Sequence, residues 1–145
     1  MHALELRHTG IVVSDLEIAL IFYRDYLGLT VSKDFAESGP YIDDLCQVDQ
    51  ADLRMVKLTT PDNGMIELLE FKSPKGTPQT TRPKNNDVGA SHVAFTVANL
   101  QDTMTFLSDR SVEFSSGPCL SPDGYAKVAF CRDPDGTLIE LVEVL

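Results

Sequence analysis

The chain has 145 residues, enough for one domain with a substantial apolar core. Hydrophobic residues make up 43% and charged residues 23% of the sequence, which excludes an intrinsically disordered protein. Twelve basic residues against 22 acidic ones give a net charge of −10. This balance argues against nucleic acid or an anionic membrane surface as the main partner, because both bind positively charged proteins.

The N-terminal segment MHALELRHTG has no signal-peptide pattern, and no apolar run in the sequence is long enough to span a bilayer. The three cysteines, Cys46, Cys119 and Cys131, are odd in number and lack a CxxC spacing, which is typical of reduced thiols. We therefore expect a cytoplasmic protein.

The first half opens with HTGIVVSDLEIALIFYRDYLGL, from His8, which predicts a short strand followed by an amphipathic helix. Ser14 is the expected N-cap, with Glu17 completing a capping box, and Gly28 is expected to end the helix. Three strands follow: LTVSKDF, ADLRMVKLTT and GMIELLEF, the last two joined by the turn TTPDNG. The insertion ESGPYIDDLCQVDQ separates the first two, and we expect its apolar residues Tyr41, Ile42 and Leu45 to pack or to form a subunit contact.

The second half repeats this order. HVAFTVANLQDTMTFLSDRSVEF, from His92, predicts a strand and then a helix capped by Asn99, and the strands VEFSSGP, YAKVAFCRD and GTLIELVEV follow. We predict an α+β fold in which tandem βαβββ modules form a curved mixed sheet (a cup) with helices on the outside. The whole chain, 1–145, would be one domain, made of modules 1–72 and 88–145 joined by the linker 73–87, which is rich in Pro, Gly and polar residues.

Strand alternation places one histidine and one glutamate of each half on the same side of its sheet. Val93, Phe95 and Val97 form an apolar face that should pack on the helix, so His92 points the other way, and His8 is equivalent to it. Glu67 and Glu140 lie at matched positions of the last strands. Glu70 and Glu143 fall on the opposite faces and are interpreted as solvated.

Two imidazoles and two carboxylates make a charge-balanced site for a divalent cation such as Zn, Ni, Co, Mn or Fe(II), if the modules bring His8, Glu67, His92 and Glu140 together. A single histidine in a strand is more often a core or surface residue, and a single glutamate more often lies at an exposed edge. The repetition of both residue types at matched positions favours the metal site. A metal would also explain why each half carries a carboxylate within an apolar strand, where burial of a charge is costly.

The motifs HTGIVVSDLEIALIFYRDYLGL, IELLEF, SHVAFTV and DPDGTLIELVEV resemble the vicinal oxygen chelate superfamily over nearly the whole chain. This superfamily includes glyoxalase I, methylmalonyl-CoA epimerase, extradiol dioxygenases, fosfomycin-modifying enzymes and bleomycin-resistance proteins. In its glyoxalase and epimerase branches the metal ligands fall at the ends of these motifs, which here are the same four residues. The complete ligand set disfavours a bleomycin-type binding protein, and a glutamate at position 67 disfavours the two branches that use two histidines and one carboxylate.

The resemblance implies a metal-dependent lyase or isomerase, similar to lactoylglutathione lyase or methylmalonyl-CoA epimerase. Such an enzyme transfers a proton next to a carbonyl through a metal-bound enediolate, with no organic cofactor. Glu140 is the first candidate for the general base and Glu67 its counterpart. The alternative is a non-catalytic small-molecule (antibiotic-type) binding protein on the same fold, and an oxygen-dependent ring-cleaving enzyme is a more distant one.

Weaker candidates for substrate binding are Arg54, Lys127, Phe35 and Tyr125, the first two for an anionic tail and the others as pocket walls. Arg54 and Lys127 can equally well be interpreted as solvated charged residues on a strand. The resemblance also implies a small-molecule substrate, such as a glutathione or CoA thioester-type compound, and a homodimer.

Overall fold

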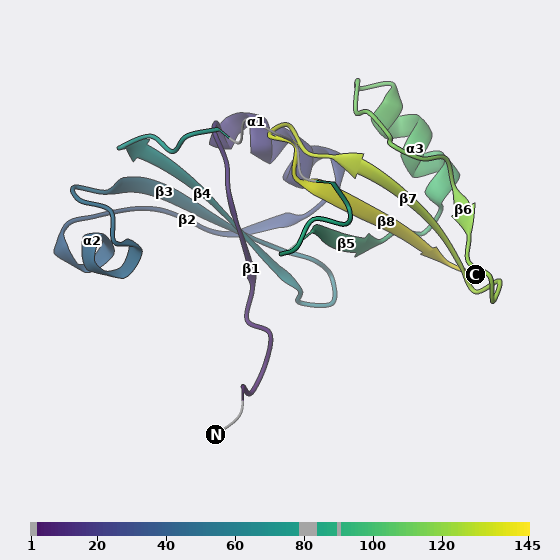
Figure 1. The fold of residues 1–145 in the computed structure, drawn as a ribbon, viewed down its shortest axis with the longest axis horizontal. Coiled ribbons are helices and arrows are strands. Elements are labelled where there is room, and N and C mark those ends of the chain that lie inside the picture. Colours follow the sequence, from purple (N-terminus) through teal and green to yellow (C-terminus); the bar gives the residue numbers. More distant parts are fainter. Residues whose placement is uncertain (1–2, 79–83, 90) are drawn as a thin grey trace. The chain divides into compact units, whose positions relative to one another are not determined.

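A computed structural model of the chain describes residues 3–78, 84–89 and 91–145 (Figure 1). It divides into two units, Met1–Pro78 and Gln79–Leu145, and each is considered by itself. The boundary between the units falls inside the predicted linker 73–87, whose residues 79–83 lie outside the described residues. The assignment of the whole chain to one domain stays a prediction.

The elements of unit 1 are, in order, β1 (Thr9–Val12), α1 (Leu16–Leu20), the π-helix η1 (Ile21–Tyr26), β2 (Thr30–Ser38), α2 (Pro40–Cys46), β3 (Asp52–Thr59) and β4 (Met65–Ser73). Its sheet has the strand order β1-β4-β3-β2, with β1 parallel to β4 and the other pairs antiparallel. The predicted turn between β3 and β4 is confirmed, because the Thr60 backbone N–H donates to the carbonyl of Gly64 at 3.0 Å.

Unit 2 contains β5 (His92–Thr96), α3 (Leu100–Ser108), β6 (Cys119–Leu120), β7 (Ala126–Arg132) and β8 (Leu138–Val144). Its strand order, β5-β8-β7-β6, matches that of unit 1 position by position, and β5 is again parallel to β8. The α+β class and the repeated βαβββ order are therefore confirmed, with α2 as an addition to unit 1.

One predicted strand, VEFSSGP, is wrong. Phe114 forms only an isolated bridge with Cys131, and the strand that pairs with β7 at this edge is the two-residue β6. Serine side chains interrupt the ladder, because the hydroxyl of Ser116 accepts from the Phe130 N–H at 3.4 Å and the hydroxyl of Ser115 donates to the Phe130 carbonyl at 3.2 Å. Such local side-chain bonds compete with regular strand pairing.

The first helix begins one residue later than the sequence suggests. Asp15, not Ser14, is the N-cap: its backbone is extended and its Oδ1 accepts from the Ile18 N–H at 3.1 Å. Glu17 therefore lies inside the first turn, does not complete a capping box, and pairs with Arg54 instead.

The remaining helix signals are confirmed. Asn99 Oδ1 accepts from the Asp102 N–H at 2.9 Å and caps α3. The first helical segment ends at Leu27, and Gly28 follows with φ +76°, a left-handed conformation that glycine adopts without a steric penalty.

The helices and sheets of each unit bury one apolar layer. Leu16, Tyr23 and Leu68 are fully buried in unit 1, and Leu100, Leu107 and Leu141 are fully buried in unit 2. Leu16, Leu100 and Leu107 thus lie on the buried faces of their helices. In each unit the core side of the sheet is the side opposite the histidine and glutamate that the sequence singles out.

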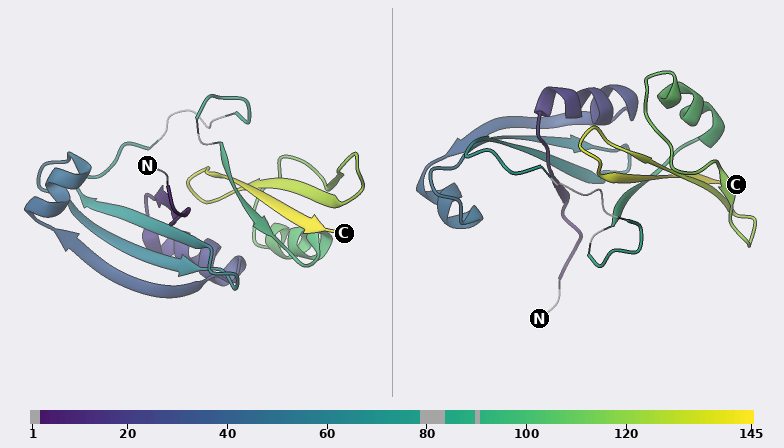
Figure 2. Two further views of the ribbon diagram at one scale, coloured as in Figure 1. Left: turned by 90° about the horizontal axis from the view of Figure 1, so that it is seen from below. Right: turned by 45° about the horizontal axis from the view of Figure 1, so that its top comes forward.

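Helix α2 covers the other face of the unit 1 sheet. Ile42 is 3% exposed and packs with Leu53 and Met55, against which Leu69 and Phe71 also lie. Figures 1 and 2 show α1 and α2 on opposite sides of the strands of this unit. The insertion therefore builds part of the wall on the Glu67 side of the sheet. Tyr41 and Leu45, for which the sequence predicts packing or a subunit contact, are exposed.

Candidate functional site

Strand pairing gives the two glutamates equivalent environments. Glu67 on β4 is aligned with Gly10 on β1, and Glu140 on β8 is aligned with Ala94 on β5. His8 immediately precedes β1, and His92 is the first residue of β5. Each histidine therefore lies two residues before the residue aligned with its glutamate, on the same side of the sheet.

In unit 1 the predicted pair comes together. The Nε2 atom of His8 lies 3.6 Å from Oε1 of Glu67, and the Glu67 side chain is only 11% exposed. Nδ1 of His8 is buried and has no hydrogen-bond partner among the described residues. A partly exposed imidazole beside a nearly buried carboxylate, too far apart for a hydrogen bond, leaves both groups able to bind a cation.

The second oxygen of Glu67 has a partner that the sequence analysis missed. Lys57 is aligned with Glu67 across the β3–β4 pair, and its Nζ lies 3.2 Å from Oε2. Alternation within ADLRMVKLTT gives the face of Lys57, but only the register between strands places it beside Glu67. In this structure the ammonium group compensates the charge of the buried carboxylate.

In unit 2 the pair is closer and more open. Nε2 of His92 lies 3.1 Å from Oε2 of Glu140, and their side chains are 38% and 22% exposed. The hydroxyl of Ser91 lies 2.7 Å from Nδ1 of His92, and the imidazole meets the ring of Phe130 edge-on at 5.4 Å. Phe130 is aligned with Glu140 across the β7–β8 pair, where unit 1 has Lys57.

The donor set fits a divalent metal ion, because neutral imidazole nitrogens and carboxylate oxygens are ordinary ligands of zinc and its neighbours. Ser91 holds Nδ1 of His92 in the way that outer-shell partners orient metal-binding histidines. Each unit by itself supplies two candidate ligands, and within the described parts of the chain no three His, Cys, Asp or Glu side chains gather as a metal site. The joint use of all four residues stays a prediction.

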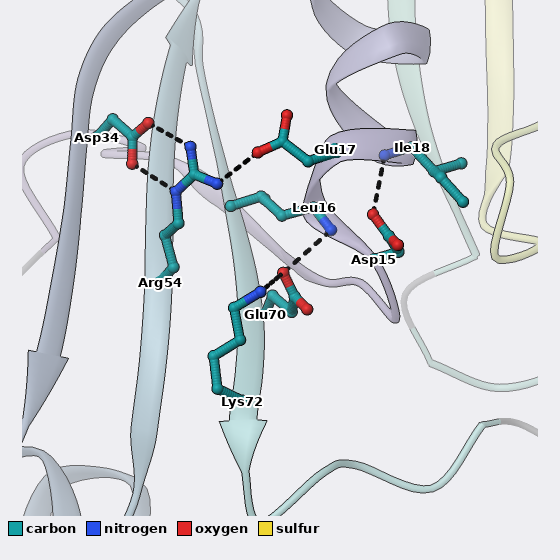
Figure 3. Close-up of polar contacts among 8 residues, drawn as sticks. All are labelled: Asp15, Leu16, Glu17, Ile18, Asp34, Arg54, Glu70 and Lys72. Carbon is teal, nitrogen blue, oxygen red and sulfur yellow. Dashed lines mark hydrogen bonds and ion pairs between the residues drawn. The ribbon is translucent and has the colours of Figure 1, made fainter.

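Glu70 is buried, Glu143 is half-buried, and each accepts a hydrogen bond from a helix N-terminus, so their interpretation as solvated residues is wrong. Glu70 is 7% exposed, and its Oε2 accepts from the N–H of Leu16, the first residue of α1, at 3.2 Å (Figure 3). Oε2 of Glu143 accepts from the N–H of Leu100, the first residue of α3, at 2.7 Å. The free N–H groups and positive end of a helix stabilise a carboxylate at this place.

Each of these caps also has a cationic neighbour. Nζ of Lys72 lies 2.6 Å from Glu70, and Nζ of Lys127 lies 3.6 Å from Glu143. Lys127 is therefore located on the helix side of the unit 2 sheet, beside the cap of α3. Its predicted role in substrate binding stays a prediction.

Arg54 lies on the corresponding face of unit 1 (Figure 3). Its guanidinium donates to both oxygens of Asp34, at 2.8 and 2.6 Å, and to Glu17 on α1 at 2.6 Å. The hydrogen bonds to Asp34 and, to a smaller extent, to Glu17 raise the pKa of Arg54. The hydrogen bond between Arg54 and Asp34 also lowers the pKa of Asp34. Arg54 thus joins β2, β3 and α1, and a substrate role for it stays a prediction.

The two aromatic candidates have different surroundings. Phe35 packs against the cluster under α2, and Nζ of Lys33 lies 4.7 Å from its ring centroid. Tyr125 is 70% exposed, just before β7. The structure thus gives Phe35 a place on the Glu67 side of unit 1, and Tyr125 a place at a strand end.

No helix in the described part of the chain is both long and apolar enough to cross a membrane.

Comparison with known proteins gives a family match over most of the chain. The model of the Glyoxalase/Bleomycin resistance protein/Dioxygenase superfamily matches residues 5–141. A lactoylglutathione lyase of Schizosaccharomyces pombe is 29% identical over 98% of the chain, which spans only 48% of that relative's length. A probable lactoylglutathione lyase of Synechocystis is also 29% identical, with 95% of this chain and 94% of the relative covered.

The crystal structure of a glyoxalase family protein from Bacillus cereus has the same fold. Its TM-score is 0.91, with 23% sequence identity, and the match covers 100% of this chain and 97% of the other.

Proposed function

The chain belongs to the glyoxalase/bleomycin resistance protein/dioxygenase superfamily, and we propose that within it the protein is a metal-dependent lyase or isomerase. One observation carries this proposal: each unit brings a histidine and a glutamate into contact at the same place in its sheet. A carboxylate within an apolar strand is costly unless it is compensated, and a fold can be built twice without one, so the repetition of this histidine–glutamate contact calls for a functional reason.

The proposed ligands are His8, Glu67, His92 and Glu140. A bound divalent ion would supply Lewis-acid stabilisation of negative charge on a substrate oxygen. Among the chain's own residues, Ser91 fixes the ring of His92 through Nδ1, and Phe130 packs against the same ring. Both contacts restrict the imidazole to one orientation, with Nε2 facing Glu140.

Glu140 is the proposed general base, which takes the proton from the carbon next to the substrate carbonyl. Its side chain is twice as exposed as that of Glu67, 22% against 11%, and its ion-pair partner is a histidine rather than a lysine. Glu67 is held from two sides, by His8 and Lys57, and a carboxylate fixed in this way is better suited to hold charge than to move protons.

The proposed substrates are small carbonyl compounds, with glutathione or CoA thioester-type compounds to be assayed first. The relatives named as lactoylglutathione lyases support this choice. The hemithioacetal of methylglyoxal and glutathione, an isomer of lactoylglutathione, tests one branch, and methylmalonyl-CoA tests the other. Exchange of the transferred hydrogen with solvent deuterium would report proton transfer in either case.

Metal analysis of protein purified without added metal tests the proposal. We expect close to one divalent ion per chain in the wild type and a loss of most of it in His92→Ala and in Glu140→Gln. Glu5→Gln, which removes a charge from an exposed side chain, serves as the control and should keep its metal. A wild-type protein that holds no metal and takes up none on addition would contradict the proposal and leave a binding protein on this fold.

A further inference from the structure

Two lysines lie side by side on the Glu67 face of unit 1. Lys33 on β2 is aligned directly with Lys57 on β3, and both ammonium groups lie over the ring of Phe35, at 4.7 and 6.0 Å from its centroid. Like charges placed directly opposite each other in a sheet are destabilising. The chain has 22 acidic residues and only 12 basic ones, and yet two of the basic ones lie together where their repulsion lowers stability.

The two lysines have different partners. Lys57 is 23% exposed and contacts Oε2 of Glu67, whereas Lys33 is exposed and rests on the aromatic ring. The pair carries two positive charges, and the contacts around it include one carboxylate. The face of the Phe35 ring attracts both ammonium groups, but it supplies no anion to balance their charge.

We propose that Lys57 and Lys33 form an anion-binding subsite for a carboxylate or phosphate group of the substrate. The inference rests on the proposed function in one respect: the substrate's carbonyl would be held near Glu67, which places its anionic group beside Lys57. When Glu67 shares its charge with a metal ion, Lys57 becomes available to a second anion. The proposed substrate is then an anionic carbonyl compound rather than a neutral aldehyde or ketone.

The equivalent position of unit 2 has no lysine. Phe130 stands where unit 1 has Lys57, so the face around Glu140 has an apolar neighbour and the face around Glu67 a cationic one.

The test separates the subsite from the metal. In metal-free Glu67→Gln protein Lys57 loses its carboxylate partner, so the lysine pair should bind anions without any metal ion. The probes are pyruvate, inorganic phosphate and the neutral analogue pyruvamide, followed through the backbone amide signals of Lys33, Phe35 and Lys57 by NMR. We expect saturable shifts with at least one anion and none with pyruvamide.

Adding Lys57→Met to Glu67→Gln should weaken anion binding at least tenfold, and adding Lys33→Met should weaken it less. Lys75→Met, which removes an equal charge from an exposed lysine beyond β4, is the matched control and should change nothing. Tighter binding of pyruvate would indicate a carboxylate as the anionic group of the substrate, and tighter binding of phosphate would indicate a phosphate. Shifts that are absent, or that persist in Glu67→Gln/Lys57→Met, would overturn the proposal whatever the metal content of the wild type.

If Glu67→Gln does not fold, as judged from its NMR spectrum, the same titration compares wild type with Lys57→Met. A tenfold weaker anion affinity in Lys57→Met supports the subsite, and equal affinity overturns it.

Discussion

The two units have the same strand order, the same capping glutamates and the same histidine–glutamate pair, but they differ beside the paired glutamate. Unit 1 has Lys57 next to Glu67, and unit 2 has Phe130 next to Glu140. Unit 1 also carries α2 on this face, which unit 2 lacks among its described elements. The shared features are those that build and support the pair, and the differences lie beside the paired glutamate.

This comparison teaches that the two carboxylates are chemically unequal despite their matched positions. Glu67 forms an ion pair with the ammonium group of Lys57, 3.2 Å away. Glu140 lies 3.1 Å from the imidazole of His92 and is aligned with Phe130 on the neighbouring strand. We therefore assign charge holding to unit 1 and proton transfer to unit 2.

The largest expected effect concerns that assignment. With the substrate identified, Glu140→Gln should lower kcat by about 10²–10⁴-fold, the usual contribution of a general base. Glu67→Gln should act mainly on metal content, and with saturating metal it should retain more activity than Glu140→Gln. The measurement is steady-state kinetics together with solvent deuterium incorporation at fixed metal occupancy. Equal kcat losses in both variants would remove the distinction between the two glutamates.

A smaller effect, on stability, tests what the units share. Glu70→Ala and Glu143→Ala should each lower the free energy of unfolding by about 2 kcal/mol, because each removes a charged hydrogen bond to the first N–H of a helix. Urea unfolding followed by circular dichroism measures the cost. Glu5→Ala, at an exposed position, should change it by less than about 0.5 kcal/mol. A cost in only one unit would mean that the two helices are not supported in the same way.

A third prediction exchanges the neighbour that differs between the units. Phe130→Lys places an ammonium group beside Glu140, as in unit 1, and should weaken metal binding about tenfold through repulsion and competition for the carboxylate. Phe130→Met, which changes size without adding charge, is the control and should have a much smaller effect. Competition with a chelating dye gives the metal affinity. If Phe130→Met weakens binding as much as Phe130→Lys, packing against His92 rather than charge is what matters.

Much of this arrangement could be predicted from the sequence because side-chain alternation along a strand has a fixed period of two. That period places His8 with Glu67 and His92 with Glu140 without knowledge of the tertiary structure, and the contacts at 3.6 and 3.1 Å agree with it. The repeat then supplies the βαβββ order of elements along the chain in both units.

Two of the errors, on the capping glutamates and on Lys57, depend on which element lies opposite a residue. Glu70 and Glu143 have the expected faces, but their burial comes from the helix N-termini packed over them. Lys57 reaches Glu67 through cross-strand register, which a single strand does not encode. The choice between Ser14 and Asp15 as N-cap depends on backbone angles, because both side chains can accept the bond.

The smallest expected effect comes from a core position where the units also differ. Leu58 on β3 is aligned with Ile66, and Cys131 on β7 is aligned with Ile139, so the two are equivalent, and both are fully buried. Burial, with a smaller effect of Asp133, raises the pKa of Cys131 to about 12. Since the ordinary thiol pKa is lower, the contribution to stability is complete at neutral pH and is lost as pH rises toward 12.

Between pH 8 and pH 10 this linkage should remove roughly 1 kcal/mol of stability from the wild type. Cys131→Val has no thiol and should lose less over the same interval, while lysine and tyrosine titrations affect both proteins alike. Urea midpoints under reducing conditions at the two pH values give the difference. An equal loss in both proteins would mean that the thiol ionises in the folded chain as readily as in the unfolded one. In that case water would reach Cys131 on β7, whereas the equivalent residue on β3, Leu58, is buried.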